Sequence, residues 1–207
     1  AGIGFVPRPG VRQSYGDFTL GHRPEKYGIM QLLGGGGFDY INDFSGQLLT
    51  REWNMMPIHL RLLSGEEIKY KISSSFEYLD TPFVLYQTTV PDGRYRFFHQ
   101  TVTLQSAKKR KVWGTVAYRF GTFYNGTRNE LKLAAGYKVM VPLFVGGELV
   151  RNDISLSEGS FIANIYRLNL NILFSPDITL YNFIQYDSQS DKMGWQSRFQ
   201  WIIRPGR

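Results

Sequence analysis

Hydrophobic and polar residues alternate with a period of two along most of the chain from about residue 66 to the end. Between 68 and 78, Ile, Tyr and Phe hold most even positions, whereas Lys, Ser and Glu hold the odd ones. The same alternation runs over 112–124, 131–139 and 192–203. A period of two places successive side chains on opposite faces of a β-strand, and none of these runs fits the helical period. The pattern therefore predicts long strands.

Short segments rich in Gly, Asn, Asp, Ser and Pro separate these runs. They are typical of tight turns between antiparallel strands, and they lie at 43–46, 91–93, 124–126, 157–159 and 175–177. One strand and one turn together take roughly 15 to 18 residues, so the chain has room for about twelve strands. We predict an all-β fold, an antiparallel β-barrel to which this chain supplies about twelve strands, either as the whole barrel or as part of a larger one.

Composition supports the all-β prediction and excludes some chemistry. Tyr and Phe, which favour strands, number 13 and 15, and there are 22 glycines. The sequence has no cysteine, which excludes disulfides and thiolate chemistry. The net charge is +7, but the basic residues are scattered, and Lys108–Lys111 is the one basic run. A nucleic-acid-binding protein usually gathers its cations on one face or segment, so we expect no nucleic-acid partner.

Alternation alone does not decide between a membrane barrel and a soluble one, because a lipocalin-like barrel turns its apolar face inward and a membrane barrel turns it outward. The predicted strands exceed the ~9 to 11 residues that cross a bilayer. Aromatic residues also stand near the segment ends, as in the girdles of membrane barrels: Tyr78, Tyr124, Trp195 and Trp201. These features favour a transmembrane β-barrel. No N-terminal signal peptide and no apolar run of helix-spanning length is visible.

An outward apolar face would leave the opposite face to line the lumen. We predict as lumen-lining residues Lys69, Lys71, Glu77, Arg119, Lys132, Lys138, Arg167 and Arg198. On the lipid face, Lys or Arg would cost about 2 to 4 kcal/mol each at mid-membrane. A basic lumen would attract anionic solutes or lipopolysaccharide phosphates, whereas a lumen closed by salt bridges would transport nothing, and both readings stay open.

Few residues suggest catalysis or cofactor binding. His22, His59 and His99 have no partner at metal-ligand spacing, and no nucleophile-elbow motif is present. The run Gly34–Gly37 lacks the Lys-Ser/Thr of a phosphate-binding loop, so we interpret it as a bend or bulge in a strand. We predict no catalytic, cofactor-binding or metal-binding residues and no cofactor.

Several short stretches, weak singly but consistent in order and spacing, resemble the C-terminal barrel of the DUF5916 family, envelope proteins with an N-terminal family 9-type carbohydrate-binding domain. They are Gly4–Arg8, Gly46–Arg51, Phe123–Gly126, Leu156–Phe161, Gln185–Asp191, Arg198–Trp201 and Arg204–Gly206. The resemblance implies a barrel in the outer membrane of a Gram-negative bacterium. It also implies that 1–207 is one barrel domain, incomplete at both ends and without the carbohydrate-binding domain.

From the pattern and the resemblance together we expect a non-enzymatic outer-membrane barrel that anchors a glycan-binding domain or assists saccharide capture or passage. The expected partners are outer-membrane lipid or lipopolysaccharide, glycans and other envelope proteins. Three alternatives stay open: an outer-membrane hydrolase acting on glycan or lipid, a component of a larger envelope complex, and a soluble ligand-binding barrel.

Overall fold

The computed structural model describes residues 10–24, 26–86 and 88–203, and these residues form thirteen strands. None of them forms a helix long and apolar enough to cross a membrane. The strands are β1 (Val11–His22), β2 (Ile29–Asp43), β3 (Leu48–Leu62), β4 (Glu67–Leu79), β5 (Phe83–Leu85), β6 (Thr88–Val90), β7 (Gly93–Gln105), β8 (Val112–Phe123), β9 (Gly126–Met140), β10 (Leu143–Leu156), β11 (Gly159–Ser175), β12 (Ile178–Asp187) and β13 (Lys192–Trp201).

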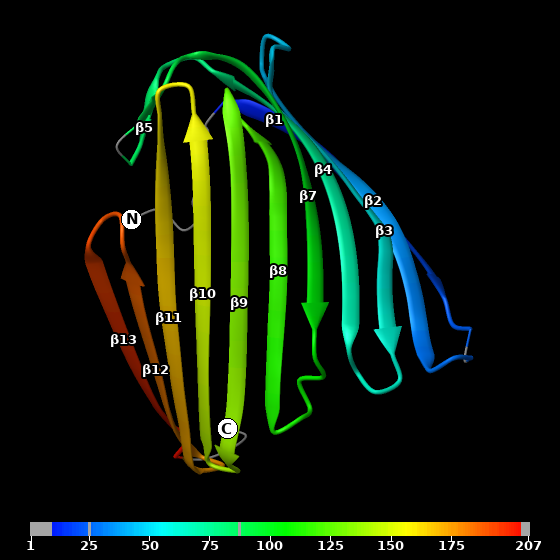
Figure 1. Cartoon of the computed structure of the whole chain (residues 1–207), viewed down its shortest axis with the longest axis vertical. Coiled ribbons are helices and arrows are strands. Elements are labelled where there is room, and N and C mark those ends of the chain that lie inside the picture. Colours follow the sequence, from blue (N-terminus) through cyan, green and yellow to red (C-terminus); the bar gives the residue numbers. More distant parts are fainter. Residues whose placement is uncertain (1–9, 25, 87, 204–207) are drawn as a thin grey trace.

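Eleven of these strands form one antiparallel sheet in which each strand pairs with its neighbours in chain order, β5 and β6 excepted. The predicted all-β antiparallel architecture is thus confirmed. The sheet curves strongly (Figure 1) but is not closed, because β1 pairs only with β2 and β13 pairs only with β12 among the described residues. The described residues do not close into a barrel, since both edges of the sheet are left without a partner strand there. The expectation that the chain belongs to a barrel, as the whole of it or as part of a larger one, stays a prediction.

The predicted turns connect these strands. Asp43–Gly46 joins β2 to β3, Tyr124–Asn125 joins β8 to β9, and Ser157–Glu158 joins β10 to β11. Tyr124 has a φ of 49°, in the left-handed region that such a tight turn demands. Two segments of the family resemblance, Gly4–Arg8 and Arg204–Gly206, lie outside the described residues.

The glycine run 34–37 lies inside β2, where the β2–β3 register shifts between Leu33 and Gly35, so the predicted bulge is confirmed. Neighbouring backbones pass very close to these glycines. A Cβ on Gly36 would lie 2.9 Å from the carbonyl oxygen of Asn54, and one on Gly35 would collide with the carbonyl oxygen of Phe18. The run therefore serves close strand packing in a bent sheet.

The two faces of the sheet differ in chemistry. On one face, the apolar face, a row of hydrophobic side chains crosses the sheet from β2 to β13, and each member is the register partner of the next. The row consists of Leu32, Leu60, Ile68, Leu104, Val116, Leu133, Leu149, Tyr166, Tyr186 and Met193. The adjacent residues on the other side, the polar face, are Gln31, Arg61, Glu67, Gln105, Thr115, Ala134, Glu148, Arg167, Gln185 and Gly194. Eight of these ten are polar or charged.

Exposure of the two faces is the reverse of that in a water-soluble sandwich or barrel. Large side chains of the apolar face are open to the surroundings, with Leu104 49% and Val116 46% exposed. On the polar face, His59 is 5% and Ser73 2% exposed. Side chains two strands apart also converge there: Trp113 of β8 and Phe144 of β10 stack 6.4 Å apart across β9. Such convergence is expected on the concave side of a curved sheet, so we identify the polar face as the concave one.

A small hairpin, β5–β6, packs against one end of the polar face. Val90 is fully buried and lies in a cluster with Leu79, Ile154 and Leu156. Ring contacts extend this cluster, with Phe83 5.4 Å from Tyr124 and Tyr86 5.3 Å from Phe161. The described chain therefore has its apolar core at this end, beneath the hairpin, and the rest of the concave face is mostly polar with a few aromatic rings.

Candidate functional site: the polar face of the sheet

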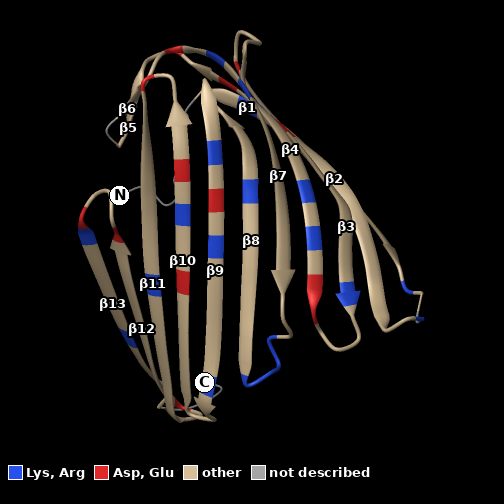
Figure 2. Ribbon diagram, in the orientation of Figure 1, with Lys and Arg blue, Asp and Glu red and all other residues tan. Residues whose placement is uncertain are grey.

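Charged residues concentrate on the central strands of the sheet, above all on β4, β9 and β10 (Figure 2). Register places most of them on the polar face, where several form ion-paired groups. Glu148 of β10 lies between two cations from neighbouring strands: Lys132 Nζ is 2.7 Å from its Oε2, and Arg167 pairs with its Oε1. Arg167 also donates through Nε to Gln185 Oε1 at 2.9 Å, which extends the group to β12.

A second group joins β3 to β4. Glu67 accepts Lys69 Nζ at 2.8 Å and contacts His59 Nε2 at 2.9 Å. Arg61 lies 3.8 Å from the same carboxylate. Because one glutamate faces two cations here, as Glu148 does, each group keeps a positive charge beyond its internal pairs.

Further groups lie nearer the hairpin end of the polar face. Arg128 pairs with Glu130 and donates through Nε to the buried Asn152 Oδ1 at 2.9 Å. Arg119 lies opposite Glu130 in the register, and its Nε is buried without a hydrogen-bond partner among the described residues. A buried donor without a partner is uncommon in folded proteins and marks a place where water or a ligand oxygen would bind.

All eight residues predicted to line a lumen lie on the polar face of the sheet. The structure brings some into shared groups: Lys132 and Arg167 meet at Glu148, and Lys69 joins the Glu67 group. Others stand apart. Glu77 accepts a hydrogen bond from the Tyr124 hydroxyl at 3.1 Å, Lys138 Nζ donates to the Lys108 carbonyl oxygen at 3.1 Å, and Lys71 and Arg198 belong to neither group. That the face they share bounds an aqueous lumen stays a prediction.

Near the β13 edge the polar face carries amides and aromatic rings instead of ion pairs. A pocket of about 400 Å³ lies against β11, β12 and β13. Besides the predicted residue Arg198, its polar-face lining consists of Asn169, Asn171, Tyr181, Phe183, Gln196 and Gln200. Amides and a guanidinium can donate to and accept from hydroxyl groups, and rings can lie against the apolar face of a sugar. The chemistry of this pocket suits a neutral, polyhydroxylated ligand.

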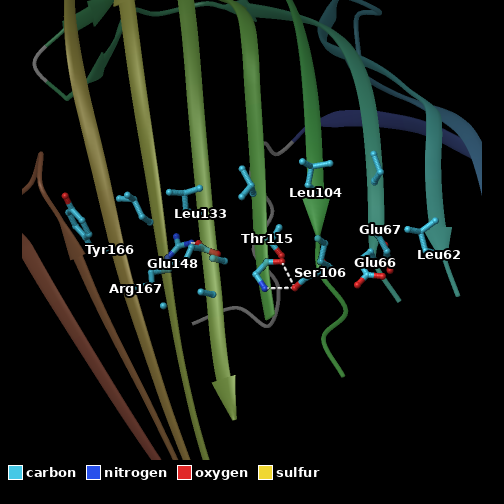
Figure 3. A pocket seen from close by; sticks show the side chains of 18 residues that line it. Leu62, Glu66, Glu67, Leu104, Ser106, Thr115, Leu133, Glu148, Tyr166 and Arg167 are labelled. Carbon is cyan, nitrogen blue, oxygen red and sulfur yellow. Dashed lines mark hydrogen bonds and ion pairs between the residues drawn. The ribbon is translucent and has the colours of Figure 1, made fainter. Parts of the chain in front are cut away.

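On the opposite, apolar face, three small residues occupy neighbouring register positions: Gly114, Ala135 and Gly147. The lack of large side chains there leaves an open groove of about 840 Å³ that runs from β3 to β11 (Figure 3). Leu104 and Leu133 line the groove, which crosses the strands at the level of the Arg167–Glu148 ion pair. The groove is a feature of the exposed apolar surface and not of the polar face.

The histidines do not assemble a reactive centre in the described part of the chain. His22 is exposed at the end of β1, His59 is held by Glu67, and His99 lies on the polar face in the register position opposite Ser73. Among the described residues no three His, Cys, Asp or Glu side chains are placed to bind one metal ion.

Sequence reasoning missed the acidic and histidine members of the ion-paired groups: His59, Glu67, Glu130 and Glu148. The alternation of hydrophobic and polar residues in the strands of Glu130 and Glu148 can be read from the sequence, so the face on which these two side chains lie could have been predicted. Their partners could not, because partners come from other strands and depend on register.

No family model, curated protein or solved structure matches this chain. The resemblance to the DUF5916 barrel therefore stays a prediction that rests on the motifs quoted above.

Proposed function

We propose that the chain forms the wall of an integral β-barrel in a bacterial outer membrane, with the apolar face toward lipid and the polar face toward a lumen. One observation carries the proposal: an apolar row that is continuous from β2 to β13 is exposed, while the residues next to it form a polar, enclosed face. A soluble barrel would hide the apolar face inside. Barrels of this type remove sheet edges by closing, so β1 and β13 would find partner strands in the complete assembly.

Surface area supports this proposal. A compact soluble protein of 23.9 kDa exposes roughly 9,900 Å². This chain exposes 13916 Å², an excess of about 4,000 Å². An open sheet exposes both faces, so the excess includes polar surface; the part that water opposes and hydrocarbon does not is that of exposed apolar side chains such as Leu104 and Val116.

The height of the apolar band supports it as well. On β9 the apolar face carries Leu131, Leu133, Ala135, Tyr137 and Val139 without interruption. Nine residues of strand extend about 27 Å, or roughly 21 Å after a tilt of about 40°. This is close to the ~25 Å apolar band of transmembrane barrels. On β10, Arg151 lies opposite Leu131 at the end of this band, and Asp153 follows beyond it on the same face.

Within this proposal the role is non-enzymatic: the barrel anchors a glycan-binding domain or assists saccharide capture or passage. The amide-rich pocket at Arg198 supports the saccharide part, because its donors, acceptors and rings suit hydroxylated ligands. No observation in the described residues favours the alternative of an envelope hydrolase.

The test is detergent dependence during purification together with heat-modifiable migration on gels, carried out on the full-length protein. We expect the protein to stay in the membrane fraction, to need detergent and to shift its band on boiling. A protein that is soluble and monodisperse without detergent would show that the apolar faces point inward or are covered, and the proposal would be wrong.

A further inference from the structure

Three arginines gather at one end of the apolar face. Arg51 of β3, Phe76 of β4 and Arg96 of β7 occupy successive register positions, and Arg94 lies two residues from Arg96 on the same face. Together with Gln47 and Leu48 they line a pocket of about 730 Å³. Phe76 is 9% exposed, so it forms the floor of this arginine pocket.

The arginine pocket has no compensating negative charge in the described structure. None of the ion pairs among the described residues involves Arg51, Arg94 or Arg96, and no carboxylate lines the pocket. On the polar face, in contrast, glutamates neutralise part of the cationic charge. The three guanidinium groups are therefore available to an anion from outside the chain.

The position of the pocket along the strands indicates what kind of anion this is. Trp53 lies two residues from Arg51, Phe98 lies two residues from Arg96, and each ring is 47% exposed on the apolar face. In membrane barrels aromatic rings lie at the interface between hydrocarbon and headgroups. Cations one step beyond the rings would stand at the level of lipid phosphates, with the apolar band beside them for acyl chains.

We propose that the arginine pocket binds the phosphate groups of lipopolysaccharide, the phosphorylated lipid of the outer leaflet. Guanidinium groups bind phosphate through paired hydrogen bonds in a fixed planar geometry. The leaflet is assigned from one connection: residues 80–92, which contain the β5–β6 hairpin, leave the sheet at this end, and longer loops face the cell exterior in such barrels. All other connections between neighbouring strands of the sheet have two to six residues. This inference rests on the proposed function.

The experiment uses the detergent-solubilised full-length protein and fluorescently labelled lipopolysaccharide, either intact or enzymatically dephosphorylated. The test variant is the triple substitution Arg51→Gln, Arg94→Gln and Arg96→Gln. The matched control, Lys108→Gln, Lys109→Gln and Lys111→Gln, removes the same charge in the β7–β8 loop at the opposite end of the sheet. Band shift on boiling is measured for every variant, so that failure to insert is seen separately from failure to bind.

We expect intact lipopolysaccharide to bind the test variant more weakly by on the order of tenfold for each guanidinium removed. The control should bind as the parent does, dephosphorylated lipopolysaccharide should bind the parent weakly, and rising salt should weaken binding. If the test variant does not fold, Arg96→Gln alone is compared with Lys109→Gln, and a tenfold difference is expected.

Equal binding by the parent and the test variant would overturn the inference. So would equal binding of phosphorylated and dephosphorylated lipid, and so would competition by phosphatidylglycerol or inorganic phosphate at the same concentration as lipopolysaccharide. In all three cases a normal band shift would leave the proposed membrane barrel standing. A parent protein that shows no band shift and needs no detergent would instead refute the proposed function itself.

Discussion

Leu133 offers the sharpest test of which face meets lipid, because the next residue, Ala134, points to the other face. Leu133 lies in the middle of β9 and in the continuous apolar row, opposite Val116 and Leu149. If the row faces hydrocarbon, Leu133→Arg should destabilise the folded protein by about 2 to 4 kcal/mol. That is roughly a 30-fold to several-hundred-fold decrease in the folding equilibrium constant. If the row faced water, a side chain that is 38% exposed should tolerate Arg within about 0.5 kcal/mol.

Ala134→Arg is the matched control, since it adds the same side chain one residue away on the polar face, opposite Glu148 in the register. Glu148 already pairs with Lys132 and Arg167, so we expect a moderate loss of stability from like-charge repulsion, smaller than the loss for Leu133→Arg, because the polar face leaves the new charge in a polar environment. Both variants are folded into phospholipid vesicles, and urea titrations are followed by tryptophan fluorescence and by band shift. Equal stabilities for the two variants would refute the assignment of the apolar face to lipid.

Three further predictions concern packing, ion pairing and pH. Gly35→Ala should destabilise the sheet by about 1 to 3 kcal/mol in thermal unfolding, because the added Cβ collides with the backbone of β1. Gly34→Ala is the control and should cost much less, because its Cβ would lie 3.6 Å from the nearest atoms. Glu148→Gln leaves two cations side by side without their shared carboxylate, so urea unfolding should show a loss of about 1 to 3 kcal/mol, and an unchanged midpoint would contradict the geometry of the group. In the β3–β4 turn, the hydrogen bond from Ser64 lowers the pKa of Glu66 below its usual 4.5. A carboxylate whose pKa is lower in the folded state stabilises the fold at neutral pH, and this stabilisation is lost as the pH falls through the folded-state pKa. Ser64→Ala should therefore reduce the loss of stability between neutral and acid pH, measured as the free energy of unfolding against pH.

Local sequence pattern predicts strands and their faces from about residue 66 onward. Period-two alternation is local, since each residue's face depends only on its position within its own strand. The faces assigned over 68–78 and 131–139 therefore agree with the register of β4 and β9, and the turns at Asp43–Gly46 and Ser157–Glu158 lie where turn chemistry predicted them.

The first 65 residues showed no such alternation, yet they contain β1, β2 and β3. Glycines 34–37 have no side chains to report a face, and the shift after Leu33 changes the phase of the pattern. A register shift can be recognised only when the partner strand is known. The strands and faces of this part of the chain could therefore not be predicted from the local pattern.

Four features depend on the arrangement of strands in space. Glu148 gained Lys132 and Arg167 as partners because register aligns β9, β10 and β11. The arginine pocket arose in the same way, because register brings Arg51 to Arg94 and Arg96, which follow it by 43 and 45 positions in the chain. Within residues 10–24, 26–86 and 88–203 the sheet is open at β1 and β13, and closure depends on curvature and strand tilt accumulated over eleven strands, which no local pattern encodes. The same curvature decides which face is enclosed. Alternation separates the residues into two faces but does not show toward which face the sheet bends.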